Sequence, residues 1–206
     1  MQIETTRLIL REMNEEDFDD LYCVLADSDI MLHYPYTFDE KRVRGWIEKN
    51  QERYQIFGFG LWAVCLKENG KMIGDCGLTL QPIGNTIKPE IGYHIQKTYQ
   101  RKGYAKEAAI AVRDWAFTHT PFQTIYSYMK STNLQSMQTA QAYGCQRVDE
   151  KEKTTVFALS KKTWLEKYKM RQEKGAPLYQ YFPCHGQRKR TYRFCRKYRL
   201  CVGCRK

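Results

Sequence analysis

A short basic turn is the stretch of this sequence best suited to chemistry. Residues 100–105 read Gln-Arg-Lys-Gly-Tyr-Ala and lie between a β-type pattern and an Ala-rich helical pattern. The first turn of a helix presents unpaired backbone N–H groups and the positive end of the helix dipole, which favour a phosphate group. Gly103 lets a ligand approach the backbone closely, and Arg101 and Lys102 add positive charge. We therefore expect a phosphorylated ligand here, although the glycine spacing is neither that of a dinucleotide-binding fold nor that of a P-loop.

Two strand–helix units must position this turn. The strand Pro89–Gln96 runs into it, and the helix that follows has apolar residues at helical spacing up to about His119. A second unit comes next, with a strand over Thr124–Met129 and a helix over Asn133–Tyr143, which Gly144 ends. The basic turn is therefore expected to begin a helix that directly follows a strand.

The remaining patterns complete a single mixed α/β domain. Asn14 caps a first helix, and Thr37 with Glu40 three residues later forms a capping box for a second helix that ends near Gly58. An Asn-Gly pair at 69–70 favours a hairpin turn. Further strands are predicted over Thr6–Arg11, Gly60–Lys67, Met72–Leu80 and Thr154–Leu159, and a short last helix over Lys162–Lys169. The order of elements is β, α, α, β, β, β, α, β, α, β, without an internal repeat.

The positive charge is concentrated at the end of the chain. The sequence has a net charge of +11, but residues 171–206 hold eleven Lys and Arg residues against one acidic residue. Residues 1–170 are left with 23 basic and 22 acidic residues, so this part is nearly neutral. We therefore place the globular domain at 1–170 and a basic, Cys- and Tyr-rich, poorly ordered extension at 171–206. Binding of nucleic acid must depend on that extension.

Cysteine usage divides the chain in the same way. The cysteines of the globular part stand among apolar neighbours without metal-ligand spacing, so we expect buried thiols; they are Cys23, Cys65, Cys76 and Cys145. Those of the extension lack the two close ligand pairs of a structural zinc site, and we predict no metal; they are Cys184, Cys195, Cys201 and Cys204. Zinc or RNA binding by the extension stays open beside an accessory role. No apolar stretch is long enough for a membrane span and no signal peptide opens the chain, so a cytoplasmic protein without membrane contact is expected.

In their order and spacing, these motifs resemble the GCN5-related N-acetyltransferase (GNAT) superfamily, in particular its RimJ/RimL-like branch. The family's Gln/Arg-x-x-Gly-x-Gly/Ala loop is matched by Gln100, Arg101, Lys102, Gly103, Tyr104 and Ala105. The opening Thr-Arg-Leu-Ile-Leu-Arg, the Glu-Ile-Gly-Tyr strand and an Asn-x-x-Ser motif before Tyr143 also match, so the resemblance covers roughly Thr5 to Lys169. It implies one α/β (α+β) GNAT-like domain, in which helices flank a mixed, mostly antiparallel central sheet with splayed parallel strands.

The resemblance implies acetyl-CoA as co-substrate, lying between two splayed strands, Glu90–Gln96 and Thr124–Met129. The pyrophosphate would rest on the loop, where residues 101–105 supply N–H donors. The pantetheine arm would run along Tyr93, His94 and Ile95 like an added strand, and a backbone N–H near Ile95 would polarise the thioester carbonyl. Asn133 matches a family position that contacts this arm, and capping its own helix is an equally good role for it.

Acetyl transfer needs a neutral amine and groups that move protons. Glu90 lies where the family often places a carboxylate and is the expected base, with a sheet-edge salt bridge as its alternative. The acid of many relatives is a Tyr seven residues after the helix Asn, but this position holds Ala140. Ser136 is the expected replacement, with a hydrogen bond inside its own helix as the alternative, so the identity of the acid stays open. His94 is a weaker candidate for proton transfer.

We therefore expect an N-acetyltransferase that transfers the acetyl group of acetyl-CoA to a primary amine by direct attack in a ternary complex. The acceptor is a protein N-terminus or a small amine such as a polyamine or aminoglycoside. The first two helices and the Gln81–Lys88 loop, on the acceptor side, have no charge pattern that selects one of them. Two other classes stay open: a non-catalytic acyl-CoA-binding sensor, which Ala140 allows, and an RNA- or ribosome-docking protein that uses the basic extension. Monomer and homodimer are both open.

Overall fold

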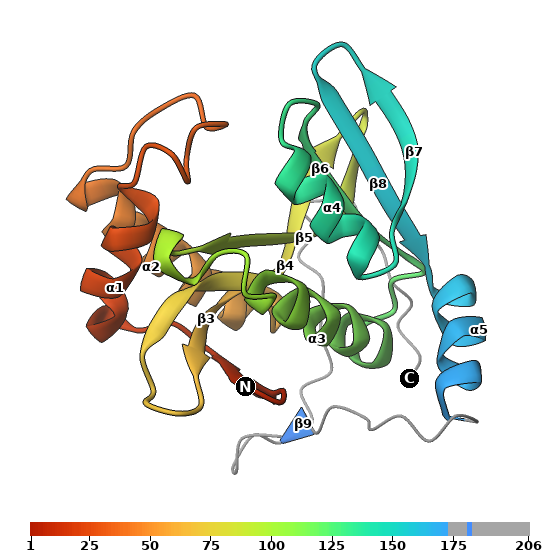
Figure 1. Cartoon of the computed structure of the whole chain (residues 1–206), viewed down its shortest axis with the longest axis horizontal. Coiled ribbons are helices and arrows are strands. Elements are labelled where there is room, and N and C mark those ends of the chain that lie inside the picture. The colour runs from red at the N-terminus through yellow and green to blue at the C-terminus, as the bar shows by residue number, and fades with distance from the viewer. Residues whose placement is uncertain (173–180, 183–206) are drawn as a thin grey trace.

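Helices cover both faces of one mixed β-sheet in the computed structural model, which describes residues 1–172 and 181–182 (Figure 1). In this part of the chain the sheet has nine strands in the order β7-β8-β6-β5-β4-β3-β2-β1-β9. The strands are β1 (Gln2–Glu4), β2 (Leu8–Arg11), β3 (Leu61–Leu66), β4 (Met72–Ile83), β5 (Thr86–Ile95), β6 (Thr124–Lys130), β7 (Gln146–Lys151), β8 (Thr154–Ser160) and β9 (Tyr181–Phe182). The α-helices are α1 (Phe18–Leu25), α2 (Glu40–Phe57), α3 (Tyr104–His119), α4 (Leu134–Ala142) and α5 (Lys161–Gln172). The predicted α/β class and mixed sheet are confirmed.

Strand β3 divides the interior into two apolar cores. All six of its residues are buried, and successive side chains point to opposite faces of the sheet. Leu61, Ala63 and Cys65 pack with apolar residues of α1 and α2, whereas Trp62, Val64 and Leu66 pack with those of α3. The two faces of the sheet are therefore covered by different helices, α1 and α2 on one side and α3 on the other.

Helix ends follow local sequence signals, with one exception. Asn14 caps as predicted: its side chain accepts from the Glu16 N–H, at a 3₁₀ turn that leads into α1. The predicted capping box of α2 is wrong, because Asp39 rather than Thr37 is the cap and accepts from the Arg42 N–H at 2.8 Å. Thr37 lies two residues before Asp39, the extended residue that directly precedes the helix.

The sheet extends beyond its predicted strands. The prediction of a loop over Gln81–Lys88 is wrong, because β4 and β5 stay paired up to Ile83 and Thr86 and enclose only a two-residue turn. Strands β1 and β7 were not predicted, and every residue of β7 is exposed, so no apolar alternation marks it. In the extension, Tyr181–Phe182 pairs with β1 as β9.

The thiols of the globular part divide by exposure. Cys65, Cys76 and Cys145 are buried as predicted, but Cys23 is exposed on α1 and the prediction is wrong there. The four cysteines of the extension lie outside the described residues. Within residues 1–172 and 181–182, no three His, Cys, Asp or Glu side chains are grouped as a metal site would require. No helix in the described part of the chain is both long and apolar enough to span a bilayer.

Candidate functional site

The sheet opens between β5 and β6, the one parallel pair among its described strands. The two strands pair only at Glu90 and Tyr126 and then run apart, although β5 continues to Ile95 (Figure 1). On its other side β5 stays in register with β4 over its full length. The expected splay is therefore present, and it leaves five residues of β5 without a partner strand on the β6 side.

The register with β4 decides which backbone groups face this opening. The Gln96 N–H donates to the Ile73 carbonyl at 2.8 Å, and alternate residues of an antiparallel strand direct both backbone groups to the same neighbour. Tyr93 and Ile95 therefore direct their N–H and C=O groups away from β4 and toward the opening. Consistent with this, the Ile91 carbonyl accepts from the Ser127 hydroxyl of β6 at 3.4 Å. An extended ligand could pair with these groups as an added strand does.

The start of α3 lies next to the end of β5, and its backbone N–H groups can bind a ligand. Gly103 stands at its N-cap position with φ of 83°, and no side chain in the described part of the chain caps this end. Arg101 also has a left-handed backbone, with φ of 62°. Left-handed residues in such a turn direct successive N–H groups to one side, which makes a concave site for an anion. A side chain at Gly103 would strain the backbone and contact the Arg7 guanidinium at 3.4 Å.

Arg7, from the N-terminal segment, holds this loop in place. Its guanidinium donates to the Lys102 carbonyl at 3.0 Å and to the Glu107 carboxylate at 2.7 Å, and it stacks on the Tyr104 ring. Glu107 lies in the first turn of α3 and also accepts from the Arg7 backbone N–H at 2.8 Å. Sequence reasoning gave Arg7 no role, because its partners are about 100 positions further along the chain.

Helix α4 forms the other wall of the opening. Asn133 caps it, with the side chain accepting from the Ser136 N–H at 3.1 Å, so the capping role is confirmed. The Ser136 hydroxyl lies 3.0 Å from the Tyr93 hydroxyl of β5, and Tyr93 also donates to the Ser136 carbonyl at 3.0 Å. Burial raises the pKa of Tyr93 above its usual value. Ala140 is fully buried, and its methyl side chain has no proton to donate.

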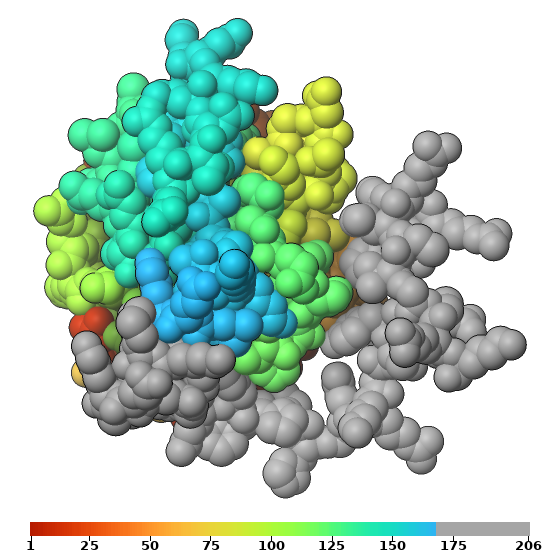
Figure 2. Space-filling model, turned by 90° about the vertical axis from the view of Figure 1, so that its right-hand side faces the viewer, coloured from red at the N-terminus to blue at the C-terminus, as the bar shows by residue number. Residues whose placement is uncertain are grey.

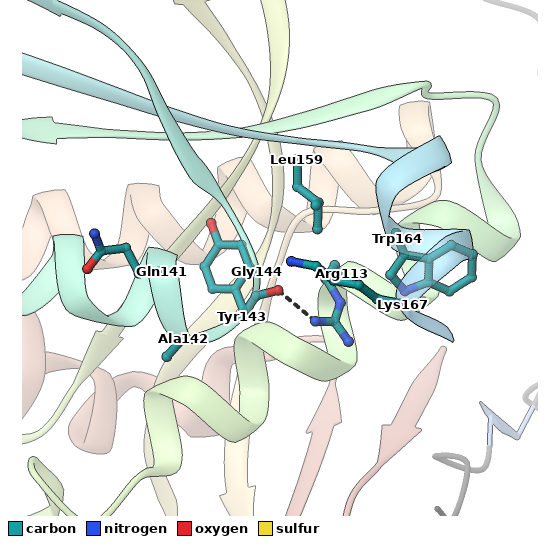
Figure 3. A pocket seen from close by; sticks show the side chains of 8 residues that line it. All are labelled: Arg113, Gln141, Ala142, Tyr143, Gly144, Leu159, Trp164 and Lys167. Carbon is teal, nitrogen blue, oxygen red and sulfur yellow. Dashed lines mark hydrogen bonds between the residues drawn. The ribbon is translucent and has the colours of Figure 1, made fainter. Parts of the chain in front are cut away.

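Arg113 of α3 fixes the far end of α4 (Figure 3). Its buried guanidinium donates to the Tyr143 carbonyl at 2.6 Å and pairs with Asp114. A cation at a helix C-terminus also interacts favourably with the helix dipole. The small cavity beside it, about 210 Å³, also includes Trp164 and Lys167 of α5. This cavity lies at the opposite end of α4 from Asn133 and Ser136, and Tyr143 is fully buried in the core.

Glu90 and His94 lie on the other face of β5 from Tyr93, because side chains alternate along a strand. Burial raises the pKa of Glu90 to about 7, and the carboxylate accepts from the Tyr128 N–H at 3.4 Å. Such a pKa lets a carboxyl group exchange a proton near neutral pH. The structure shows this backbone hydrogen bond where a sheet-edge salt bridge was the alternative.

His94 belongs to a buried hydrogen-bonded chain. Its Nδ1 lies 2.7 Å from Asp75 Oδ1 on β4, and its Nε2 lies 2.9 Å from the hydroxyl of Tyr34 in the segment between α1 and α2. Asp75 is fully buried and also accepts from Trp46 Nε1 at 2.9 Å. The backbone N–H and C=O of His94 point to β4 and its side chain points to the α1–α2 side, so neither faces the opening along which the pantetheine arm is expected. Asp75 was not predicted, because a lone Asp inside a strand gives no signal.

A cavity of about 610 Å³ lies on the same face as Glu90, between two hairpins. Figure 2 shows the tips of the β4–β5 and β7–β8 hairpins standing side by side. The residues that line it are Pro82, Ile83, Gly84, Asn85, Thr86, Lys88, Tyr128, Val148, Asp149, Lys151, Glu152, Thr154 and Val156. Two of them are basic and two acidic, so the wall has no net charge. Its volume is in the range of small-ligand sites.

The predicted site residues fall into two groups, one on each face of β5. The loop residues, Tyr93, Ile95, Asn133 and Ser136 surround the opening between β5 and β6, while Glu90 and the His94 side chain lie on the cavity side. Hydrogen bonds add two further residues to each group. Arg7 and Glu107 belong with the loop, and Asp75 and Tyr34 belong with His94.

Comparison with known proteins agrees with this geometry. The family model described as "Acetyltransferase (GNAT) domain" matches residues 7–146. YkkB of Bacillus subtilis, named an uncharacterized protein, is 32% identical over 144 residues, 69% of this chain and 84% of YkkB. An acetyltransferase from Agrobacterium tumefaciens has a crystal structure that matches with a TM-score of 0.68 and 26% identity, over 77% of this chain and 94% of that one. RimL, a ribosomal alpha-N-protein acetyltransferase solved in complex with coenzyme A, shares the fold at 18% identity and a TM-score of 0.62, over 78% and 98%. The chain belongs to the GNAT acetyltransferase family.

Proposed function

We propose that this protein transfers the acetyl group of acetyl-CoA to a primary amine. The observation that carries the proposal is the uncapped start of α3 beside the unpaired edge of β5. A diphosphate needs several N–H donors and positive charge, which the loop residues 101–105 offer. An extended amide-containing arm needs a strand edge, which Tyr93 and Ile95 offer. Acetyl-CoA has both a diphosphate and such an arm.

Within this proposal, each face of β5 has its own task. When bound, acetyl-CoA supplies an activated acetyl group. The Ile95 N–H faces the opening and polarises the thioester carbonyl, while Gln100 to Ala105 hold the diphosphate and Asn133 borders the pantetheine arm. Gln100 stabilises the end of β5 directly, since its side chain donates to the Ile95 carbonyl at 2.9 Å. The amine approaches from the other face, where the cavity between the hairpins leads to the Glu90 strand.

Two side chains are proposed to move protons. Glu90 takes the first proton of the acceptor ammonium, directly or through water, because its pKa of about 7 suits a base at neutral pH. Ser136 donates to the leaving thiolate, and its contact with Tyr93 orients its hydroxyl toward β5. No covalent enzyme intermediate is needed when amine and thioester are held together.

The cavity between the hairpins supports a proposal for the acceptor class. Its wall is neutral overall and includes the apolar side chains of Ile83, Val148 and Val156, so it suits an amine with an apolar neighbour better than a bare polycation. A protein N-terminus meets this description, as does a small amine. RimL, named an alpha-N-protein acetyltransferase, shares the fold, and we propose that this chain is a cytoplasmic enzyme of the RimJ/RimL-like branch.

Mass spectrometry of acetyl transfer tests the proposal. The full chain is incubated with acetyl-CoA and, in separate reactions, with spermidine, kanamycin and a peptide with a free N-terminus. We expect a mass gain of one acetyl group on at least one amine and stoichiometric release of coenzyme A. Tight binding of acetyl-CoA without transfer to any amine would instead identify an acyl-CoA sensor. Absence of binding would refute both functions.

A further inference from the structure

The steps above give no role to the hydrogen-bonded series Tyr34–His94–Asp75. Asp75 lies directly opposite His94 in the β4–β5 register, so the two side chains share one face. Both carboxylate oxygens of Asp75 have partners, Nδ1 of His94 and Nε1 of Trp46. The His94 side chain is only 10% exposed. Such an arrangement fixes the imidazole in one orientation.

The direction of each hydrogen bond follows from the groups. A carboxylate only accepts, so the proton of a neutral His94 lies on Nδ1 and points to Asp75. Nε2 then carries the lone pair and accepts from the Tyr34 hydroxyl. Burial, and next the Asp75 carboxylate, raise the pKa of Tyr34 above its usual value near 10. Tyr34 therefore gives its proton to Nε2 only as it receives another, and the imidazolium that results is balanced by Asp75.

The position of His94 along β5 separates it from Glu90. His94 is next to Ile95, whose N–H faces the opening, whereas Glu90 lies four residues earlier, about 13 Å along an extended strand. An acceptor nitrogen within hydrogen-bond reach of Glu90 is therefore out of reach of the groups near His94, and the reverse also holds. The face therefore offers two proton acceptors at two stages of the acceptor's path.

Acetyl transfer to an ammonium requires two protons to leave the nitrogen atom. The ammonium nitrogen of a primary amine carries three protons and the amide product carries one. The first proton must leave before attack, to free the lone pair, and the second leaves as the carbon–nitrogen bond forms. One of the two reaches the sulfur of coenzyme A by way of the proton donor, and the other is released to solvent.

We propose that Tyr34, His94 and Asp75 form a relay that takes the second proton, at the acetyl carbon, while Glu90 takes the first. As the carbon–nitrogen bond forms and the carbon–sulfur bond breaks, the nitrogen proton passes to the Tyr34 oxygen and the Tyr34 proton passes to Nε2 of His94. His94 and Tyr34 contact the transferred proton, and Asp75 is a positioning residue that sets the tautomer. The relay rests on the proposed acetyl-transfer function.

Steady-state kinetics of the full chain over pH 6 to 9.5 test the relay, with the fastest amine of the three named above. We expect His94→Gln and Asp75→Asn to lower kcat about 100-fold and Tyr34→Phe about 10-fold, with both KM values changed less than about 3-fold. The loss in these variants should be the same at high pH, because the second proton leaves whatever the charge of the free amine. The loss in Glu90→Gln should shrink at high pH, where the amine is already neutral.

Matched variants separate the relay from a structural role. Tyr22→Phe removes a tyrosine hydroxyl from α1 and should leave kcat unchanged, and a merely structural loss would lower the unfolding temperature and raise KM. If His94→Gln does not fold, Tyr34→Phe decides alone, since it keeps the ring. A kcat within 3-fold of wild type in Tyr34→Phe and His94→Gln, or a loss that disappears at high pH, would overturn the relay. A wild-type chain that acetylates none of the amines would refute the proposed function itself.

Discussion

The two faces of β5 are built from neighbouring residues, yet they differ in how they are held. The face with Tyr93 and Ile95 borders an opening bounded by helix starts, α3 with its left-handed loop and α4 with its Asn133 cap. The face with Glu90 and His94 is lined by side chains that β4 and the α1–α2 segment supply. Backbone groups dominate the first face and titratable side chains the second. In our proposal the first face therefore binds the cofactor and carries the proton donor Ser136, and the second face accepts the protons of the amine.

The largest effect is expected from a change on the backbone face. Gly103→Glu requires a left-handed backbone from a residue that disfavours it and places a negative charge where the diphosphate is proposed to lie. We expect the Kd for acetyl-CoA to rise more than about 100-fold in titration calorimetry.

Gly70→Glu is the matched control for this change. Gly70 also has a left-handed backbone, with φ of 74°, but a Cβ there meets nothing within 4 Å. It lies in the β3–β4 turn, and its Kd should equal that of wild type. Equal Kd values for both variants would show that the loop does not bind the diphosphate.

The second largest effect is expected from a change on the face that carries Glu90 and His94. Glu90→Gln removes the proposed base without changing the opening, so kcat should fall about 100-fold while the Kd for acetyl-CoA changes little. In wild type, kcat/KM should rise with pH up to about 7, where the carboxyl group of Glu90 loses its proton, and then level off. The rise near 7 should be absent in the variant. An unchanged pH–rate profile would remove Glu90 from the mechanism.

A weaker effect is expected from a change at Arg7, which holds the loop in place. Arg7→Met removes the hydrogen bond to the Lys102 carbonyl and the ion pair with Glu107, so the loop loses its orientation but not its amides. The Kd for acetyl-CoA should rise about 10-fold, with kcat nearly unchanged. Lys67→Met, which removes the neighbouring ion pair with Glu4, serves as control and should leave the Kd unchanged. A Kd within 2-fold of wild type in Arg7→Met would deny Arg7 this role.

The smallest effect concerns stability. Glu90 has a pKa of about 7 in the folded protein against 4.5 for an ordinary Glu, so the folded state binds more protons between these values. The free energy of unfolding contributed by Glu90 therefore decreases as pH rises from about 5 to 8. Urea unfolding at pH 5, 6.5 and 8 should show a smaller decrease in Glu90→Gln than in wild type. Parallel pH dependences would contradict the assigned burial.

Local signals made the backbone face predictable from sequence. The basic turn before an Ala-rich helix, the Asn133 cap and the Gly144 stop each depend on a few adjacent residues, and the strand–helix order fixes the topology around them. The splay of β5 and β6 followed from the family resemblance. The left-handed conformation of Arg101 had no such signal, because a non-Gly residue rarely adopts it.

The side-chain face was less predictable because its contacts are long-range. Tyr34 and His94 are 60 positions apart, and Asp75 gains its importance only from the antiparallel register that places it opposite His94. Strand β7 escaped prediction because its residues are all exposed and only pairing with β8 holds them extended. The cavity between the hairpins exists because β4 and β5 continue past the expected loop.

Hydrogen–deuterium exchange of the backbone amides, with and without coenzyme A, tests the separation of the two faces most directly. Amides of residues 101–105 and those of Tyr93 and Ile95 should exchange more slowly when coenzyme A is bound, while those of the β7–β8 hairpin keep their rate. Protection confined to residues 82–88 and 148–156, with no change at the α3 start, would place the ligand on the opposite face and contradict this account.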